Sequence, residues 1–399
     1  MSNDLVMDRP SHIAADKVVD FDFYADLSCA DPHALAARLA REHPVFWTPR
    51  NGGHWVLAGH RELFDASRNT EVFSSTSQSI PRIEEEVHLH PINDDPPQHA
   101  VYREPLGKAF SPQRMMALQD EIRALAVELI EKVRNHGHCD FARDIAEPLP
   151  VLIFMKVMGL PLDEMPRYRQ WVLDIINTPD MTVRANAVQQ SLAAMMAIVE
   201  DRKRERRNDL ISVLLDEKIA GRPVTDDEMR GYCLLLMIGG LDTVMNGMCY
   251  GIRHLASHPD LQAQLRADPS RIPDAMEEIL RRYTFTLPGR RIAKDHEAFG
   301  VTFKKDERVM LMLSAGDLDP REFDKPEVFN MERENNPHMA FYTGVHRCVG
   351  SHLARVELRV LYEEMLARLP DFRLDPEHPP QIMGGRVVGF RSLPLVWDA

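Results

Sequence analysis

The residues with the clearest chemical potential stand near the end of the chain, in the run Phe341-Tyr342-Thr343-Gly344-Val345-His346-Arg347-Cys348-Val349-Gly350. The pattern at 351–368 predicts an amphipathic helix, so Cys348 precedes a helix N-terminus. Free N–H groups and the macrodipole favour an anion at such a place. This environment lowers the pKa of a thiol and favours the thiolate. The flanking glycines let the backbone turn tightly and approach a flat ligand. An isolated cysteine in such a place is more often a small buried hydrophobe, yet a thiolate is also the ligand that favours O–O cleavage at a haem iron.

A second candidate is the run Ile238-Gly239-Gly240-Leu241-Asp242-Thr243-Val244, in the middle of the longest predicted helix, 226–256. Two adjacent glycines cost about 1 kcal/mol each relative to alanine in a helix. One interpretation is a helix–helix contact that needs small residues. The other is a local opening of the helix beside a ligand, where the Thr243 hydroxyl bonds a carbonyl one turn earlier and Asp242 relays protons to a buried site.

Three further groups are weaker when taken alone. His99 and Arg103 stand one helical turn apart and suit either an anionic ligand or an ordinary solvated helix face. Glu278 and Arg281 share one face of a helix, as many surface ion pairs do. His88-Leu89-His90 carries metal-binding side chains, but two histidines in a loop without a third ligand are more often free of metal.

Taken in chain order, these motifs resemble those of the cytochrome P450 family. The pattern Phe-x-x-Gly-x-His-x-Cys-x-Gly is similar to the cysteine-ligand loop of that family, with Tyr342 where most members carry glycine. The resemblance runs from about residue 20 to the C-terminus. The sequences at 239–244 and 393–398 are similar to those of bacterial class I members of the camphor hydroxylase group. It implies a mainly α fold with small β-sheets, in which a haem b lies buried between the long central helix and the cysteine-ligand loop.

The resemblance also implies roles for single residues. Cys348 would be the iron ligand, and Asp242 and Thr243 would manage the protons consumed when O2 is cleaved. The residues that would bind the haem propionates are His99, Arg103, Arg291 and His346. The residues that would form a buried structural lock are Glu278, Arg281 and Arg333.

The implied reaction is insertion of one oxygen atom of O2 into a C–H bond of a small apolar substrate. Camphor-hydroxylating members place a tyrosine before Asp-Pro-Pro to bond the substrate ketone, and Val87 stands at that position here. An apolar site cannot give that orientation, so we expect a different ring, a terpenoid or norisoprenoid such as an ionone. The pocket candidates by alignment are Val87, Ile238, Leu287, Gly289 and Val387.

We find no reductase motif and therefore expect electrons from outside. The resemblance implies a [2Fe–2S] ferredoxin supplied by a NAD(P)H-dependent ferredoxin reductase. An acidic ferredoxin needs a basic patch, for which the candidates are Arg103, Lys108, Arg114, Arg282 and Arg347. Three alternatives stay open: a peroxide-driven haem-thiolate enzyme, a haem-based ligand-binding protein, and a protein without haem in which Cys348 is a core residue.

Helical periodicity dominates the elements that must position these residues. We expect helices at 31–42, 59–67, 113–135, 142–157, 163–176, 186–206, 226–256, 258–266, 273–283 and 351–368. Strand-like text occurs at 54–58, 309–313 and 393–397. The proline-bearing stretch 77–98 is typical of an ordered loop that covers a site.

Composition bounds what the chain can bind. A formal net charge of −13 over 399 residues disfavours binding to duplex nucleic acid, and the basic run 202–207 is typical of a solvated helix end. Five cysteines without a CxxC pair argue against a disulfide framework. Polar residues interrupt both long apolar stretches, 149–162 and 233–252, so no membrane span is expected. We expect one cytoplasmic domain over residues 1–399, with 1–20 as a flexible N-terminal arm.

Overall fold

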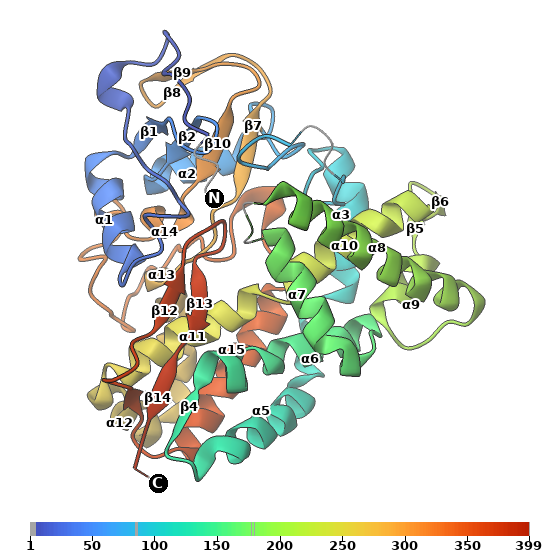
Figure 1. Ribbon diagram of the computed structural model, residues 1–399, viewed down its shortest axis with the longest axis vertical. Coiled ribbons are helices and arrows are strands. Elements are labelled where there is room, and N and C mark those ends of the chain that lie inside the picture. The colour runs from blue at the N-terminus through green and yellow to red at the C-terminus, as the bar shows by residue number, and fades with distance from the viewer. Residues whose placement is uncertain (1–4, 84–86, 177, 179, 399) are drawn as a thin grey trace.

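Helices form most of the molecule (Figure 1). The computed structural model describes residues 5–83, 87–176, 178 and 180–398. Its α-helices are α1 (Pro32–Glu42), α2 (His60–Arg68), α3 (Gln98–Ala109), α4 (Pro112–Met116), α5 (Gln119–Arg134), α6 (Pro148–Met158), α7 (Met165–Ile176), α8 (Met181–Arg204), α9 (Leu210–Asp216), α10 (Asp226–Gly240), α11 (Thr243–Ala256), α12 (Pro259–Ala267), α13 (Ile272–Arg282), α14 (Leu313–Gly316) and α15 (Ser351–Arg368). Shorter turns are the 3-10 helices η1 (Ala15–Lys17), η3 (Leu162–Glu164), η4 (Pro269–Arg271) and η5 (Gly344–His346), and the π-helix η2 (Ala142–Ala146). The mainly α fold class is confirmed.

The strands are short and build several small sheets. They are β1 (Val45–Thr48), β2 (His54–Leu57), β3 (Phe73–Ser74), β4 (His138–Asp140), β5 (Lys218–Ile219), β6 (Arg222–Pro223), β7 (Gly289–Ile292), β8 (His296–Ala298), β9 (Val301–Phe303), β10 (Arg308–Leu311), β11 (Arg373–Leu374), β12 (Gln381–Met383), β13 (Gly389–Ser392) and β14 (Pro394–Val396). The largest sheet has the order β1-β2-β10-β7-β3. In it, β10 runs parallel to β2 and antiparallel to β7, so Val309 lies opposite both Trp55 and Arg290. This sheet lies with α1 and α2 at the upper left of Figure 1, apart from the larger helical part.

The long central helix predicted at 226–256 is interrupted. A capping box between Thr225 and Glu228 starts α10, which ends at Gly240, and α11 begins at Thr243. The predicted helix 113–135 is likewise divided, because Ala117 and Leu118 separate α4 from α5. Both halves of the central helix stay close to the predicted bounds, so the correction concerns the break alone.

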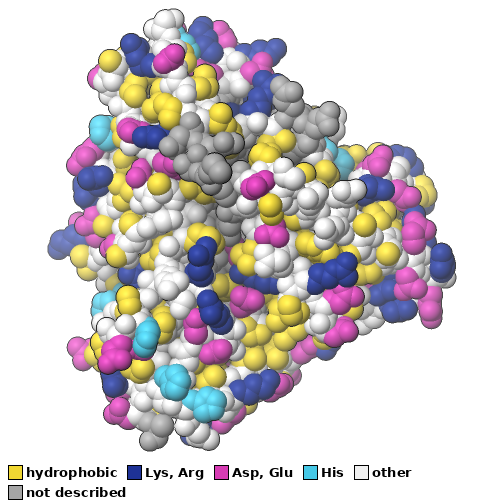
Figure 2. Space-filling view, viewed as in Figure 1, with side chains coloured by type: hydrophobic (Ala, Val, Ile, Leu, Met, Phe, Trp, Pro, Cys, Tyr) yellow, Lys and Arg dark blue, Asp and Glu magenta, His cyan; other side chains and the backbone are white. Residues whose placement is uncertain are grey.

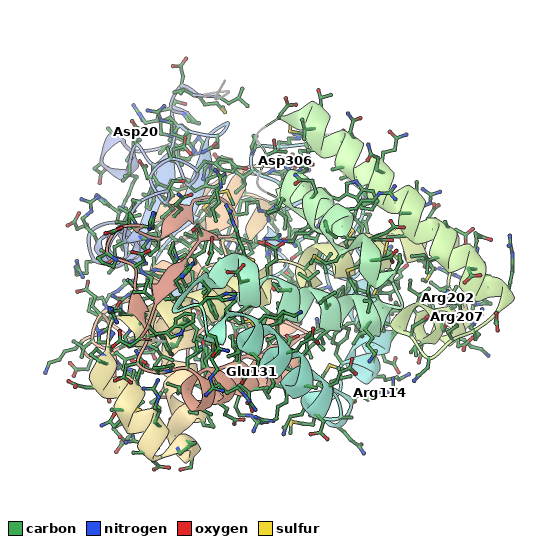
Figure 3. All side chains as sticks on the ribbon, turned by 60° about the horizontal axis from the view of Figure 1, so that its bottom comes forward. Asp20, Arg114, Glu131, Arg202, Arg207 and Asp306 are labelled. Atoms are coloured by element: carbon green, nitrogen blue, oxygen red, sulfur yellow. The ribbon has the colours of Figure 1, made fainter. Side chains whose placement is uncertain are left out.

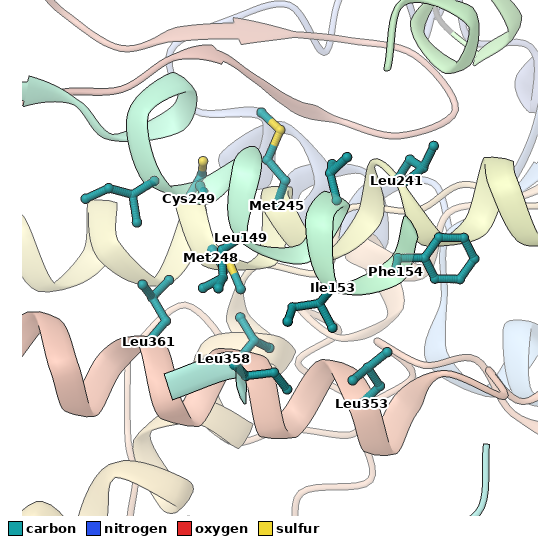
Figure 4. Close-up of a cluster of buried hydrophobic side chains, with 14 of the residues drawn as sticks. Leu149, Ile153, Phe154, Leu241, Met245, Met248, Cys249, Leu353, Leu358 and Leu361 are labelled. Carbon is teal, nitrogen blue, oxygen red and sulfur yellow. The ribbon is translucent and has the colours of Figure 1, made fainter. Parts of the chain in front are cut away.

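The main hydrophobic core surrounds α11. Figure 4 shows Leu241, Met245, Met248 and Cys249 between side chains of two other helices: Leu149, Ile153 and Phe154 of α6, and Leu353, Leu358 and Leu361 of α15. α11 and α15 pack closely at Gly251, where a Cβ would meet the Tyr362 hydroxyl at 1.8 Å. A larger residue at Gly251 would therefore push apart the two helices that flank the candidate site.

The expected N-terminal arm and the basic run each contain buried residues. Within the expected flexible arm 1–20, Ile13 is buried and Val18 pairs with Trp47, whereas residues 5–9 are exposed. In the basic run 202–207, Lys203 to Arg207 are exposed, but Arg202 is buried, bonding Asp209 and the Gly159 carbonyl. Figure 3 places Arg202 and Arg207 at the end of α8. Figure 2 shows positive and negative side chains interspersed over one face of the molecule.

One stretch, Asp226–Ala256, is long and apolar enough to cross a membrane by length and composition. The protein buries 67% of its most apolar window, as expected for the core helices α10 and α11. Two hydrogen bonds join the start of the loop 77–98 to its later part. The Gln78 side chain donates to the Ile92 carbonyl at 2.6 Å, and the Asn93 side chain donates to the Ser75 carbonyl at 3.2 Å.

Candidate active site

A backbone hydrogen bond of 2.9 Å, from the Cys348 N–H to the Phe341 carbonyl, closes the cysteine loop. Gly344 has a φ of 71°, and a Cβ there would meet the Ser67 carbonyl oxygen at 2.8 Å, so this position requires glycine. Tyr342 also has a positive φ, 61°. Tyrosine thus adopts here a backbone conformation that glycine adopts freely.

The Cys348 side chain is accessible, whereas Cys139, Cys233 and Cys249 are buried. It lies in the wall of a pocket of about 190 Å³ lined by Arg103, Gly107, Phe110, Ser111, Pro112, Arg347, Val349, Ser351 and His352. Protein nevertheless surrounds the sulfur, and this burial raises the pKa of the Cys348 thiol against the Gly350 N–H and nearby arginines, which lower it. Burial therefore opposes the predicted lowering of this pKa, and coordination to a metal ion would deprotonate the thiol outright.

The adjacent glycines Gly239 and Gly240 have different surroundings. The Thr243 hydroxyl donates to the Gly239 carbonyl at 2.9 Å, the bond to a carbonyl one turn earlier that opens a helix. Gly239 is exposed at the C-terminal end of α10, and a Cβ there would meet nothing within 4 Å. A Cβ on Gly240 would instead meet the Phe154 ring at 2.5 Å. Gly239 therefore borders open space, and Gly240 permits a helix–helix contact, so both interpretations of the pair apply.

Asp242 is buried at the break between α10 and α11. Its carboxylate accepts a 2.8 Å hydrogen bond from Arg169, which is also buried and comes from α7. Asn246 donates to the Asp242 carbonyl at 3.0 Å. A buried charge requires such a partner, so Arg169 and Asp242 form one electrostatic unit.

Four basic side chains gather beside the cysteine loop: His99 and Arg103 from α3, His346 from η5 and Arg290 from β7. The rings of His99 and His346 meet edge to face at 4.5 Å, and the Ser75 hydroxyl lies 2.9 Å from Nε2 of His346. Burial, together with the charges of Arg290, His99 and Arg103, lowers the pKa of His346 to about 2. Burial and Arg103 also lower the pKa of His99, whose Nε2 is buried without a partner. Concentrated donors and positive charge fit an anionic ligand.

The predicted structural lock is assembled as a buried network. Arg281 makes a paired contact with Glu278, both bonds measuring 2.8 Å, and both residues are at most 1% exposed. Arg333 approaches the same carboxylate at 3.3 and 3.4 Å. Arg281 also donates to the carbonyls of Asp317 and Pro326. The network joins α13 to the segment that leads to the cysteine loop.

The sequence model of the cytochrome P450 family matches residues 85–397. The chain belongs to the cytochrome P450 family. A steroid C26-monooxygenase of Mycolicibacterium smegmatis is 33% identical over 94% of each chain. Linalool 8-monooxygenase of Pseudomonas putida is 30% identical over 86% of this chain and 90% of its own length. The crystal structure of CYP101C1 superposes with a TM-score of 0.91 at 35% identity, covering 98% of this chain and all of the other.

This cytochrome P450 is therefore a haem-thiolate monooxygenase of bacterial class I type. Its residues fit the cofactor. An accessible cysteine sulfur stands on the loop, open space adjoins Gly239 on the central helix, and His99 offers a buried nitrogen without a partner. The family also requires O2 and a redox partner.

The structure does not bring Arg291 into the basic cluster of this cytochrome P450. Arg291 bonds Asp306 at 2.8 Å on the outer side, whereas the neighbouring Arg290 is buried and donates to the Tyr342 hydroxyl at 2.7 Å. The Arg290 guanidinium also lies over the Tyr342 ring, 4.9 Å from its centre. Successive side chains of a strand point to opposite faces of the sheet. An assignment shifted by one residue in β7, from Arg290 to Arg291, therefore places the side chain on the other face.

The pocket candidates occupy different surroundings. Val87 and Ile238 are half-buried against the main core, and Val387 is buried in it. Leu287 belongs to a second cluster, but its backbone bonds that of Arg386 at 2.9 Å, which brings it near Val387. A Cβ on Gly289 would meet the Gln78 carbonyl oxygen at 2.0 Å. Gly289 therefore allows β7 to pack closely on the loop 77–98, which is a different role from lining the pocket.

Sequence reasoning missed Arg169, Arg290 and Arg355. Arg355 bonds Glu277 and lies over the Phe341 ring, 4.4 Å from its centre, so it supports the start of the cysteine loop. Arg355 could have been found as a cation within the buried face of helix 351–368. Arg169 carries no comparable signal, because its partner lies 73 residues away.

Proposed function

We propose that this cytochrome P450 hydroxylates a small apolar ring, a terpenoid or norisoprenoid of the ionone type. The observation that carries the proposal is Val87, which is half-buried against the main core at the position where camphor-hydroxylating relatives present a tyrosine. Ile238 and Val387 add further apolar surface. Such a surface selects by shape and apolar area, because the side chains of Val87, Ile238 and Val387 carry no hydrogen-bond donor for a substrate ketone. A relative named as a linalool monooxygenase supports a terpenoid substrate.

Haem, when bound, supplies the oxidising chemistry, while the chain holds the substrate, excludes water and manages protons. We assign the iron ligand to the Cys348 sulfur and propionate binding to His99, Arg103, Arg290 and His346. Arg290 replaces Arg291 in this set because it alone of the two is buried beside His346.

Asp242 and Thr243 are assigned to proton delivery. Asp242 is a buried acid at the helix break, held by Arg169 at 2.8 Å. Thr243 follows it on the first turn of α11, and its hydroxyl bonds the carbonyl of Gly239, the residue that borders open space. When Asp242 exchanges Arg169 for water, it can take up a proton and pass it inward to the Thr243 hydroxyl.

Electrons come, in this proposal, from a [2Fe–2S] ferredoxin and its NAD(P)H-dependent reductase in the cytoplasm, a compartment that the free cysteines favour. The docking patch contains Arg103 and Arg347, which line the pocket at Cys348, and the exposed Arg114 on α4. Arg114 projects from the outer surface in Figure 3. Two earlier candidates leave the patch. Lys108 is paired with Glu104 and Glu217, and Arg282 is turned toward the Glu327 carbonyl.

The substrate test is a titration of the purified ferric enzyme with α-ionone, β-ionone, linalool and camphor, read as a low-to-high-spin change in the haem spectrum. We expect a larger change with an ionone than with camphor, and a product that carries one atom from isotopically labelled O2. Stronger binding of camphor, or product oxygen derived from water, would contradict the proposal. Turnover with hydrogen peroxide in the absence of ferredoxin would instead favour a peroxide-driven enzyme.

The ligand assignment has its own test. The reduced carbon monoxide complex should show the Soret band of thiolate-ligated haem in the parent, and this band should be lost in Cys348→Ala. Cys139→Ala is the matched control, because Cys139 is a buried cysteine of the core. An unchanged band in Cys348→Ala would refute the assignment.

A further inference from the structure

A cluster of metal-binding side chains lies in the loop before α3, outside the site described above. Asp94 lies between two imidazoles, with one carboxylate oxygen 2.7 Å from Nε2 of His88 and the other 2.8 Å from Nδ1 of His90. The ligand atoms of these three residues all lie within 4.8 Å of one another. The sequence showed two histidines without a third ligand, and the fold supplies the third.

The donor set has a definite chemical preference. Imidazole nitrogens with one carboxylate oxygen are typical ligands of Zn²⁺ and other divalent transition metals, whereas Mg²⁺ and Ca²⁺ prefer oxygen alone. Each imidazole–carboxylate contact holds a hydrogen that one metal ion can replace.

The three ligand side chains differ in their exposure to solvent. His88 is about half exposed, at 46%, while His90 and Asp94 are only 14% and 7% exposed. An ion can therefore reach the cluster from solvent along His88 and lose most of its water on the inner two ligands. A water molecule would complete the coordination as a fourth ligand, as in zinc sites with three protein ligands.

Neighbouring contacts hold the turn in place. The His90 ring stacks on Tyr102 at 3.9 Å, and the Tyr102 hydroxyl donates to Glu228 on α10 at 2.9 Å. The Leu89 N–H donates to the Asn93 side chain at 2.9 Å. Such surrounding contacts fix the orientation of ligands before a metal binds.

The turn lies directly against α10. A Cβ on Gly231 would meet the His88 carbonyl oxygen at 2.6 Å and the His90 ring at 3.1 Å, so glycine permits this contact. The same helix carries Gly239, which borders the open space of the active site. Residue 87, the pocket candidate, immediately precedes the cluster. All three ligands belong to the turn, so an ion bound here would hold the shape of the turn that packs against α10.

We propose that His88, His90 and Asp94 bind one divalent transition-metal ion, with Zn²⁺ as the representative ion, and that this ion holds the 88–94 turn in the shape that packs against α10. Ion binding adds its free energy to this shape of the turn, because the ion binds tightly only where the three ligands are held together.

The test measures Zn²⁺ binding to the haem-loaded enzyme after treatment with a chelator, by isothermal titration and by elemental analysis after dialysis. We expect one ion per chain in the parent. His90→Ala and Asp94→Asn should weaken binding by on the order of 100-fold or more, since loss of mere outer contacts costs 10–100-fold. Mg²⁺ in excess should not compete. Hydrogen exchange in 88–94 should slow when Zn²⁺ is added to the parent and stay unchanged in Asp94→Asn.

The matched control is the double variant His136→Ala/His138→Ala, which removes another histidine pair, with ring centres 6.5 Å apart. It should bind Zn²⁺ as the parent does. His88→Ala repeats the test at a half-exposed position in case loss of the His90–Tyr102 stack impairs folding. The proposal would be overturned if the ligand variants bound Zn²⁺ as the parent does, or if the control double variant lost Zn²⁺ binding.

Discussion

Arg169 on α7 donates a 2.8 Å hydrogen bond to Asp242, and the two side chains meet in the interior at the break between α10 and α11. Arg169 also forms a second, longer ion pair, in which its Nε lies 3.5 Å from the Glu147 carboxylate. The acid that we assign to proton delivery is therefore restrained by a cation from a different helix. Its availability depends on how readily that pair opens.

Asp242→Asn should lower the turnover number by about 100-fold, the usual contribution of a positioned proton donor. The substrate-induced spin change should remain, because Asn keeps the volume and the contact with Asn246. The measurement is product formed per enzyme per unit time at saturating substrate and electron donor, compared with Glu147→Gln, which removes the more distant partner of Arg169. Equal turnover by Asp242→Asn and the parent would remove Asp242 from the mechanism.

Arg290→Leu should speed the loss of haem by about tenfold or more, because a charge-assisted hydrogen bond contributes about 1.5–3 kcal/mol. Arg291→Leu is the matched control, since Arg291 pairs with Asp306 on the opposite face of β7. The measurement is the rate of haem transfer to an excess of an acceptor protein. Faster loss from Arg291→Leu than from Arg290→Leu would restore the original assignment from sequence.

The chemistry-bearing motifs could be predicted because each is local in sequence. The cysteine loop and the Gly239–Thr243 segment lie within a few residues, so spacing alone indicates their local structure. The missed partners are distant: Arg169 reaches Asp242 across 73 residues, and Arg290 reaches Tyr342 across 52.

The sequence predicted β2, β10 and β14, but the other short strands were missed for a related reason. β7 spans four residues, too few for the alternation of apolar and polar side chains that reveals a strand, and its position depends on pairing with β10. Asp94 illustrates the same limit within one loop, because its contact with His88 depends on how the turn folds back.

Glu278→Gln should destabilise the protein by about 3–5 kcal/mol, because it leaves Arg281 and Arg333 without their buried carboxylate. The matched control is Glu128→Gln, which removes an exposed pair with Lys132 and should cost less than about 1 kcal/mol. Chemical unfolding of the haem-loaded proteins measures both. A cost for Glu278→Gln no larger than that of the control would show that the network contributes little to stability.

Glu357 predicts a specific dependence of stability on pH. It is buried on α15 with one carboxylate oxygen lacking a partner, and burial raises its pKa from 4.5 to about 8. Between these two values the unfolded chain releases the proton and the folded protein keeps it, so the contribution of Glu357 to the free energy of unfolding falls by about 1.4 kcal/mol per pH unit. Above about pH 8 this contribution levels off, because both states are then ionised.

Glu357→Gln removes the titration while keeping the shape of the protonated acid. The variant and parent should have similar stability near pH 4.5, and the variant should become increasingly more stable than the parent up to about pH 8. Denaturant unfolding across this range measures the difference. The matched control, Glu364→Gln on the same helix, should instead be less stable than the parent, because Glu364 pairs with Arg123 and Arg368. Parallel pH profiles for Glu357→Gln and the parent would mean that Glu357 is ionised or solvated in the folded protein.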